Sequence, residues 1–276
     1  MEARKSVKKS WYVHLLLFTG TVLMIFPFIW MFLSAFKTDL DVFSYPPKWL
    51  PSTWTLENFP RVLEMVPFVR YYLNSIVVTS SITFGQVFLS ILAAYALARL
   101  HFPGKTAVTI LLLSTMIMPF QVTLVPMFMI VYKFGWIDTY QGLIVPFLFS
   151  GFSIFFLRQF FVTIPKDLED AAKIDGCGYF GILFNVIMPN SKAPIGTISL
   201  FVFLTHWRSY LWPLVVTNSP EMRTLPVGLK YFVEEGGTQY NLMMAASLMA
   251  IIPVLIVYIV AERHLVKSTT LTGLKF

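Results

Sequence analysis

The stretch TIPKDLEDAAKIDGCGYFGILFNVIMPNSKAP, from Thr163 to Pro194, is the most informative part of this sequence. It is a charged segment that lies between two strongly apolar ones. Charged residues make up only 13% of the 276-residue chain, whereas roughly a quarter is usual in soluble domains. A polar segment in so apolar a chain is typical of a membrane protein that presents a short helix to a soluble partner.

The first part of this segment carries the signals of a short helix. Thr163 or a neighbour is expected to cap it, and Pro165 suits its first turn. Gly176 suits the left-handed position that ends many helices. Three acidic residues favour the positive N-terminal end of the helix: Asp167, Glu169 and Asp170. A helix of about 11 residues is not stable alone in water. It is therefore either a solvated connector or a helix that docks on another surface.

Outside this segment, six apolar runs predict membrane-spanning helices. Each run is close to the roughly 20 residues that a helix needs to cross a bilayer. The runs cover residues 12–35, 73–98, 106–131, 142–162, 195–217 and 242–261. Pro119 and Pro126 fall inside the third run, where neighbouring helices are expected to accommodate them. We therefore expect an all-α membrane protein with six transmembrane helices.

The distribution of Lys and Arg predicts the orientation of these helices. Thirteen of the 21 basic residues fall on the side of the two termini, and eight fall on the other side. Basic residues accumulate on the cytoplasmic side. We expect both termini, the 99–105 loop and the 163–194 segment to be cytoplasmic, with long outer loops at 37–72 and 218–241. The net charge of +7 thus reflects topology, and no nucleic-acid surface is expected.

The 163–194 segment resembles the EAA loop of ABC importer permeases. That family's pattern is E-A-A, three residues, Gly, nine residues, then I-x-L-P. Here it reads Asp170-Ala171-Ala172, Gly176 and Val186-Ile187-Met188-Pro189, with Asp for Glu, Val for Ile and Met for Leu. Four further segments are similar to the carbohydrate branch of the family, and to the second permease of maltose and glycerol-phosphate systems: Asn74–Lys105, Leu157–Gly176, Trp207–Leu214 and Arg263–Lys275.

The resemblance implies that the 163–194 loop holds a coupling helix between spans 4 and 5, which docks on an ATP-binding subunit. It implies coupling residues in this loop: Glu169, Asp170, Ala171, Ala172, Asp175, Gly176 and Pro189. It implies a C-terminal tail that contacts the ATPase pair, with Gly273, Leu274 and Lys275. The outer loop containing Glu234, Glu235, Gly236 and Gly237 would contact an extracytoplasmic solute-binding protein. The alternative for this loop is an ordinary connector.

The same resemblance implies the assembly around the chain. The chain would divide into residues 1–72, the first span with its outer loop, and 73–276, the ABC importer transmembrane domain. It would lie in the lipid of the bacterial cytoplasmic membrane and form, with a second homologous permease, a pathway for a sugar or related polyol. Two ATP-binding subunits would carry ATP-Mg, and this chain would bind no cofactor of its own.

The pathway is harder to locate in the sequence. The second span is unusually polar, and Gln121 lies close to Pro119 in the third. We predict pathway roles for four of these polar residues: Asn74, Thr79, Gln86 and Gln121. The alternative is that they hydrogen-bond one helix to another, since small and hydroxyl residues favour close packing in bilayers.

Other functional classes find less support in the sequence. The four histidines are scattered without metal-ligand spacing, the single Cys177 excludes an internal disulfide, and no Gly-rich loop with Lys-Ser/Thr predicts ATP hydrolysis by this chain. An ion-coupled secondary transporter would be expected to show charges at mid-membrane or broken helices, and neither stands out. An intramembrane enzyme would need catalytic groups clustered at one depth. We therefore expect a non-catalytic permease subunit.

Overall fold

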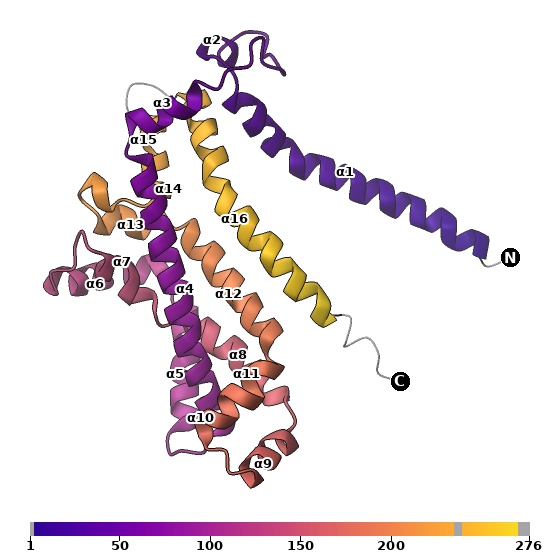
Figure 1. The fold of residues 1–276 in the computed structure, drawn as a ribbon, viewed down its shortest axis with the longest axis vertical. Helices are drawn as coiled ribbons and strands as arrows, with labels where there is room; N and C mark the ends of the chain where they lie inside the picture. Colours follow the sequence, from indigo (N-terminus) through magenta and orange to yellow (C-terminus); the bar gives the residue numbers. More distant parts are fainter. Residues whose placement is uncertain (1–2, 235–238, 270–276) are drawn as a thin grey trace. The chain divides into compact units, whose positions relative to one another are not determined.

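The computed structural model describes residues 3–234 and 239–269, and the side chains of residues 11–233 and 239–261. All regular elements in these ranges are helical, as predicted (Figure 1). The chain forms two compact units. Unit 1 contains the residues up to Phe68 together with Gly228–Ile252, and unit 2 contains Val69–Val227 and the residues from Pro253 onward. The division between residues 72 and 73, made for a family domain, stays a prediction.

Within the described residues, three helices are long and apolar enough to cross a membrane: Trp11–Ala35, Phe68–Arg99 and Tyr240–Ala261. They correspond to the predicted first, second and sixth spans. The predicted third and fourth spans are each replaced by a bent pair of helices. A third bent pair covers only the first part of the predicted span 195–217: it begins inside the loop predicted at 163–194 and ends at Trp207, and Leu211–Val216 forms a separate helix. The pairs are Lys105–Ile117 with Phe120–Lys133, Tyr140–Phe147 with Gly151–Thr163, and Tyr179–Asn190 with Lys192–Trp207. Six candidate spans result if each bent pair counts as one.

The sharpest bend, 105°, separates α5 (Lys105–Ile117) from α6 (Phe120–Lys133). Pro119 causes it, because proline lacks an N–H and forces the preceding residue into an extended conformation. Met118 accordingly has φ −76° and ψ 120°. The expectation that Pro119 is accommodated inside one helix was therefore wrong, whereas Pro126 does lie inside α6. The other two bends, of 40° and 82°, were also not predicted from the sequence.

Unit 1 is organised by buried polar side chains. The Asn58 amide donates to the carbonyl oxygens of Ala35 and Lys37, both at 2.8 Å, and its own oxygen accepts from Asn241 at 2.9 Å. These bonds fix the turn that follows the first long helix. The helices of this unit are α1 (Ala3–Ala35), α2 (Asp39–Val42), α3 (Asn58–Met65), α15 (Tyr231–Glu234) and the first part of α16 (Tyr240–Thr269).

Unit 2 is built around α4 (Phe68–Arg99). Its largest fully buried side chain is Trp212 of α13, and others come from α4, α7, α8, α12, α14 and the segment from α10 to η2. Gly151 at the start of α8 lies so close to α5 that an added Cβ would overlap Thr115, which allows these two helices to pack tightly. The other elements are α7 (Tyr140–Ile144), η1 (Val145–Phe147), α8 (Gly151–Thr163), α9 (Lys166–Ile174), α10 (Tyr179–Ile182), the π-helix η2 (Leu183–Ile187), α11 (Met188–Asn190), α12 (Lys192–Trp207), α13 (Leu211–Val216), η3 (Pro220–Met222) and α14 (Leu225–Leu229).

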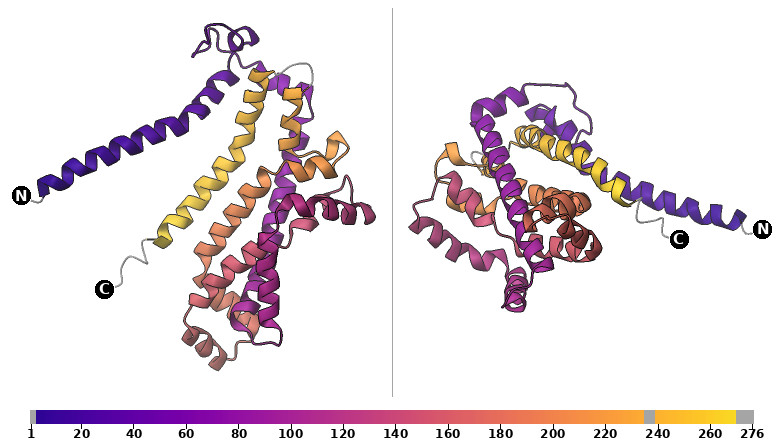
Figure 2. Two further views of the ribbon diagram at one scale, coloured as in Figure 1. Left: turned by 180° about the vertical axis from the view of Figure 1, so that it is seen from behind. Right: turned by 60° about the horizontal axis from the view of Figure 1, so that its bottom comes forward.

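The two ends of α4 carry different loops. The N-terminal half contacts the segment after α13, where Asn74 donates to the carbonyl oxygens of Glu221 and Arg223. The C-terminal end contacts α9, which lies beyond it in both Figure 1 and the left view of Figure 2. Residues 221–223 of the predicted outer loop 218–241 and α9 of the predicted cytoplasmic loop thus lie at opposite ends of this helix.

Candidate coupling site

The helix predicted in the 163–194 segment is α9, Lys166–Ile174. It has acidic residues in its first turn, Asp167 and Glu169, and Lys173 in its last, an arrangement that complements the helix dipole. Pro165 precedes its first residue. Thr163 does not cap α9, because its hydroxyl donates to the carbonyl oxygen of Phe160 in the preceding helix. The prediction of a Thr163 cap was therefore wrong.

The end of α9 is the left-handed turn predicted at Gly176, whose φ is +80°. The Cys177 N–H donates to the Ala172 carbonyl at 2.9 Å, and the Gly176 N–H donates to the Lys173 carbonyl at 3.0 Å. This pair of bonds is the Schellman motif, which satisfies the last carbonyl groups of a helix. The motif sharply ends α9 and turns the chain toward α10.

The two alanines of the EAA pattern face opposite ways. Ala172 is 8% exposed and belongs to the core of unit 2, as does the side of α9 that carries Glu169. Ala171 is exposed. On the exposed side, Ile174 is 87% and Leu168 is 44% accessible. This side of α9 therefore offers apolar as well as charged groups for contact with another protein.

The buried side of α9 is held by an ion pair. Nε of Arg99, the last residue of α4, lies 2.6 Å from a carboxylate oxygen of Glu169, and the two side chains are only 5% and 8% exposed. The same guanidinium donates from Nη2 to the carbonyl oxygen of Phe161 at 2.7 Å and to that of Ile164 at 2.5 Å. Arg99 thus satisfies carbonyl groups at the end of α8 as well as the carboxylate of α9.

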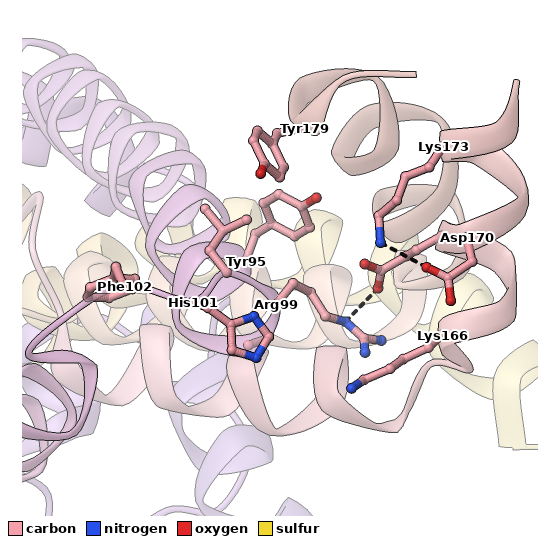
Figure 3. Close-up of a pocket in the computed structure, with 11 residues that line it drawn as sticks. Tyr95, Arg99, His101, Phe102, Lys166, Asp170, Lys173 and Tyr179 are labelled. Atoms are coloured by element: carbon pink, nitrogen blue, oxygen red, sulfur yellow. Dashed lines mark hydrogen bonds and ion pairs between the residues drawn. The ribbon is translucent and has the colours of Figure 1, made fainter. Parts of the chain in front are cut away.

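A cavity of about 450 Å³ lies between the end of α4 and α9 (Figure 3). Lys173 also lines it and pairs with Asp170 at 2.8 Å, but these side chains are 55% and 62% exposed. The hydrogen bond from Lys173 lowers the pKa of Asp170, and the same bond raises the pKa of Lys173. Both groups are therefore charged at neutral pH. The full lining is Tyr95, Ala98, Arg99, Leu100, His101, Phe102, Lys166, Glu169, Asp170, Lys173 and Tyr179.

The remaining predicted loop residues lie around this helix. Asp175 is exposed at the C-cap of α9. Pro189 is exposed in α11, just before the 82° bend that leads into α12, and Ile187 beside it is fully buried. The apolar half of the EAA pattern therefore anchors the loop in unit 2, and its acidic half stays accessible.

Three of the four predicted pathway residues are buried inside unit 2. Asn74 bonds the segment after α13 and accepts from the Tyr140 hydroxyl at 2.7 Å, and Gln86 donates to the Ser153 hydroxyl at 2.8 Å. Thr79 is 1% exposed. These bonds match the alternative that such groups join one helix to another. Gln121, by contrast, is exposed. A pathway role for any of the four stays a prediction.

Two predicted contact regions fall outside the described residues. Glu235, Gly236 and Gly237 of the outer loop belong to this group, and so do Gly273, Leu274 and Lys275 of the tail. Glu234 is the last residue of α15, but its side chain is not among those described. Their assignments to the binding protein and the ATPase pair stay predictions.

The sequence did not point to Arg99 or to Ile174. Arg99 looks like any basic residue that ends a transmembrane helix on the positive side, and only the fold brings it to Glu169. Ile174 was recognisable as an apolar residue in a polar helix, but nothing in the sequence distinguishes the buried face of α9 from the exposed one.

Known proteins are similar to this chain in sequence and in fold. A family model described as "Binding-protein-dependent transport system inner membrane component" matches residues 86–267. The sn-glycerol-3-phosphate transport system permease protein UgpE of Rhizobium meliloti (strain 1021) is 32% identical over 264 residues, which cover 92% of this chain and 94% of that protein. The arabinooligosaccharides transport system permease protein AraQ of Halalkalibacterium halodurans is 30% identical over 278 residues and matches over 100% of both chains.

A solved structure agrees with the fold. A chain of a bacterial ABC transporter involved in the import of the acidic polysaccharide alginate superimposes with a TM-score of 0.85, at 24% identity, over 95% of this chain and 98% of that one. The family match covers more than half of the chain and includes all of α9. The chain therefore belongs to the family of binding-protein-dependent transport system inner membrane components, the permease subunits of ABC importers.

Proposed function

We propose that this permease forms, with a second homologous permease, the pathway by which a sugar or related polyol enters a bacterial cell. The substrate class is supported by the relatives, which are named for sn-glycerol-3-phosphate and for arabinooligosaccharides. In this proposal the three long helices and the three bent pairs make six spans with both termini cytoplasmic. The charge distribution and the opposite placement of the loops along α4 support that orientation.

The observation that carries the coupling role is the two-faced nature of α9. One face is fixed to unit 2 by Glu169 and Ala172, and the other presents Asp170, Ala171 and the 87% exposed Ile174. The small Ala171 allows close approach, and Ile174 supplies apolar area. We infer that this face docks in a groove of an ATP-binding subunit, so that movements of that subunit reach the permease.

The remaining assignments complete the importer. ATP-Mg binds to and is hydrolysed by two separate ATP-binding subunits, and this chain supplies no catalytic group. The tail at Gly273–Lys275 reaches the ATPase pair, and the outer loop that contains Glu234–Gly237 receives a solute-binding protein. The dependence on such a protein is part of the family description.

Purification in mild detergent from the native membrane tests the assembly. A tagged chain should bring down a second permease and an ATPase, identified by mass spectrometry, with ATP hydrolysis in the eluate. The bent helices are also a feature of many ion-coupled secondary transporters, which makes that class the second candidate. A lone chain that accumulates solute on an ion gradient without ATP would establish the secondary transporter instead.

The two adjacent alanines provide a matched test of the docking face. Ala171→Leu adds bulk only to the exposed side of α9, whereas Ala172→Leu adds it to a packed core and should cost about 1–3 kcal/mol of stability. Ala171→Leu should leave the chain stable in the membrane but release the ATP-binding subunit and stop uptake. Normal uptake by Ala171→Leu would disprove the docking assignment.

A further inference from the structure

One side chain, that of Arg99, joins three helices of unit 2. It contacts the Glu169 carboxylate of α9, the Phe161 carbonyl of α8 and the Ile164 carbonyl in the connection between them. Arg99 itself is the last residue of α4. The coupling helix and the segment that leads into it are therefore both held to α4 by a single guanidinium group, which Figure 3 shows at the edge of the cavity.

The chemistry of this junction suits a rigid connection. The ion pair is shielded, since the Arg99 and Glu169 side chains are 5% and 8% exposed, so water and salt compete little for it. A guanidinium holds its donors in a fixed plane and can serve a carboxylate and carbonyl groups together, whereas the lysine ammonium is a compact point charge on a flexible stem. Here the guanidinium donates to the two carbonyl groups, and its Nε lies against the Glu169 carboxylate as an ion pair, which holds α9 close to α4.

The other buried contact of α9 is apolar. In the part of the chain whose side chains are described, its buried residues are Glu169 and Ala172. The methyl group of Ala172 contributes packing but no direction. Pro165 precedes α9 without a side-chain cap in this part of the structure. The ion pair between Arg99 and Glu169 is thus the buried polar contact between α9 and α4 in these residues.

α4 offers a direct route from this junction to the other end of unit 2. It is a continuous helix of 32 residues, which corresponds to a length of about 48 Å. Near its other end Asn74 holds the segment at Glu221 and Arg223 through two hydrogen bonds. The same continuous helix therefore contacts both α9 and the segment bound by Asn74.

We propose that Arg99 is a positioning residue that couples α9 to α4, so that a displacement of α9 is transmitted along α4 to the segment beyond α13. The proposal rests on the proposed docking of α9 on an ATP-binding subunit. If a residue only helps the chain to fold, its replacement reduces the amount of assembled complex, and the complex that does assemble responds normally to nucleotide. A coupling residue affects the response to nucleotide in a complex that is still assembled.

The test uses the complex purified with its ATP-binding subunits and needs no knowledge of the solute. Val69, the second residue of α4, is 60% exposed. It is replaced by cysteine, and maleimide labelling of this cysteine is followed by mass spectrometry, which distinguishes it from Cys177. Labelling is measured without nucleotide and with ATP and vanadate. The wild-type background should show a nucleotide-dependent change in rate at position 69.

Arg99→Gln and Glu169→Gln should each reduce this change about tenfold, while the ATP-binding subunit still co-purifies. The double variant should lose no more than either single one, because both remove the same interaction. Arg99→Lys should restore part of the response, since it keeps the charge. Arg158→Gln is the matched control: Arg158 donates to the Leu97 carbonyl and so joins α8 to α4, and it should leave the response unchanged.

Several outcomes would overturn the inference. These are a normal nucleotide response in assembled Arg99→Gln, an equal loss in Arg158→Gln, additive losses in the double variant, or no response at position 69 in the wild type. Failure of all Arg99 and Glu169 variants to assemble would assign the pair to folding alone. The proposed function fails differently, when the wild-type chain binds no ATPase at all.

Discussion

α4 holds a distant loop at each end, and the two attachments differ in chemistry. At one end the neutral Asn74 amide donates to two backbone carbonyl groups, those of Glu221 at 2.7 Å and Arg223 at 2.9 Å. At the other end the charged Arg99 binds the side chain of Glu169. Both attachments are buried, and both join segments far apart in the sequence.

The difference determines what each loop must contain. A bond to backbone carbonyls accepts almost any side chain in the loop, so the segment near Glu221 is free to vary in sequence without detaching. A buried ion pair requires one particular partner, because either group alone leaves an uncompensated charge. Removing a neutral partner costs about 1–3 kcal/mol, and breaking a buried ion pair costs about 3–5 kcal/mol.

The largest effect is therefore expected from Arg99→Leu. It leaves the Glu169 carboxylate buried and unpaired and should lower the free energy of unfolding by about 3–5 kcal/mol. Trypsin should then cut faster at the exposed Lys166 and Lys173 of α9. Arg99→Leu with Glu169→Leu should recover much of the stability, since apolar pairs often replace buried ion pairs without loss. Unchanged thermal midpoint and cleavage in the single variant would disprove the role of the pair.

Asn74→Leu should have a smaller effect, confined to the other end of α4. The Arg223 carbonyl and the Tyr140 hydroxyl lose the Asn74 side chain as a partner, whereas the Glu221 carbonyl still accepts from Arg70 Nε at 3.2 Å. The expected cost is about 1–3 kcal/mol, and tryptic cleavage after Arg223 should increase while cleavage in α9 stays as in the wild type. Equal loosening of both ends would show that the attachments are not independent.

Gly176→Ala should have a still smaller effect on stability. The left-handed φ of +80° costs any other residue about 1–2 kcal/mol, but a Cβ there meets no atom within 4 Å. Gly178 is the control, since it has φ −76° and equally open surroundings, so Gly178→Ala should be neutral. If uptake falls far more in Gly176→Ala than its thermal midpoint explains, the turn itself contacts the ATP-binding subunit. Equal thermal midpoints for the two variants would contradict the strain argument.

Much of this fold could be predicted from the sequence, because long apolar runs and helix-ending residues act locally. Pro165 and Gly176 marked α9 to within a few residues. The breaks were harder to predict. Pro126 stays within a helix and Pro119 ends one, although both lie in the same apolar run, because tertiary packing decides whether the freed backbone groups find partners.

The candidate site was predictable as a segment but not as a surface. Ala171 and Ala172 were indistinguishable in the sequence, and only packing shows that Ala172 points into unit 2. Arg99 could not be paired with Glu169, because nothing local relates the end of α4 to a helix that follows two bent pairs later. The polar residues of α4 invited a pathway assignment, since hydrogen bonding to a solute and to a neighbouring helix require the same side chains.

The smallest effect is expected from Lys173→Ala, which breaks the second ion pair of α9. Lys173 and Asp170 are 55% and 62% exposed, so water and salt screen their attraction, and the thermal midpoint should not change measurably. Because the pKa of Asp170 is lowered in the folded protein, its contribution to stability is present above the ordinary pKa of 3.8 and is lost as the pH falls through the lowered pKa. Because the pKa of Lys173 is raised, its contribution to stability is complete below the ordinary pKa of 10.5 and is lost only as the pH rises through the raised pKa.

The exposed pair should therefore respond neither to pH between about 5 and 8 nor to its own removal. Raising the salt concentration at neutral pH should leave the difference between the wild type and Arg99→Leu intact, because the Arg99–Glu169 pair is shielded. A loss in Lys173→Ala as large as that in Arg99→Leu would mean that charge on α9, rather than burial at the end of α4, holds the helix in place.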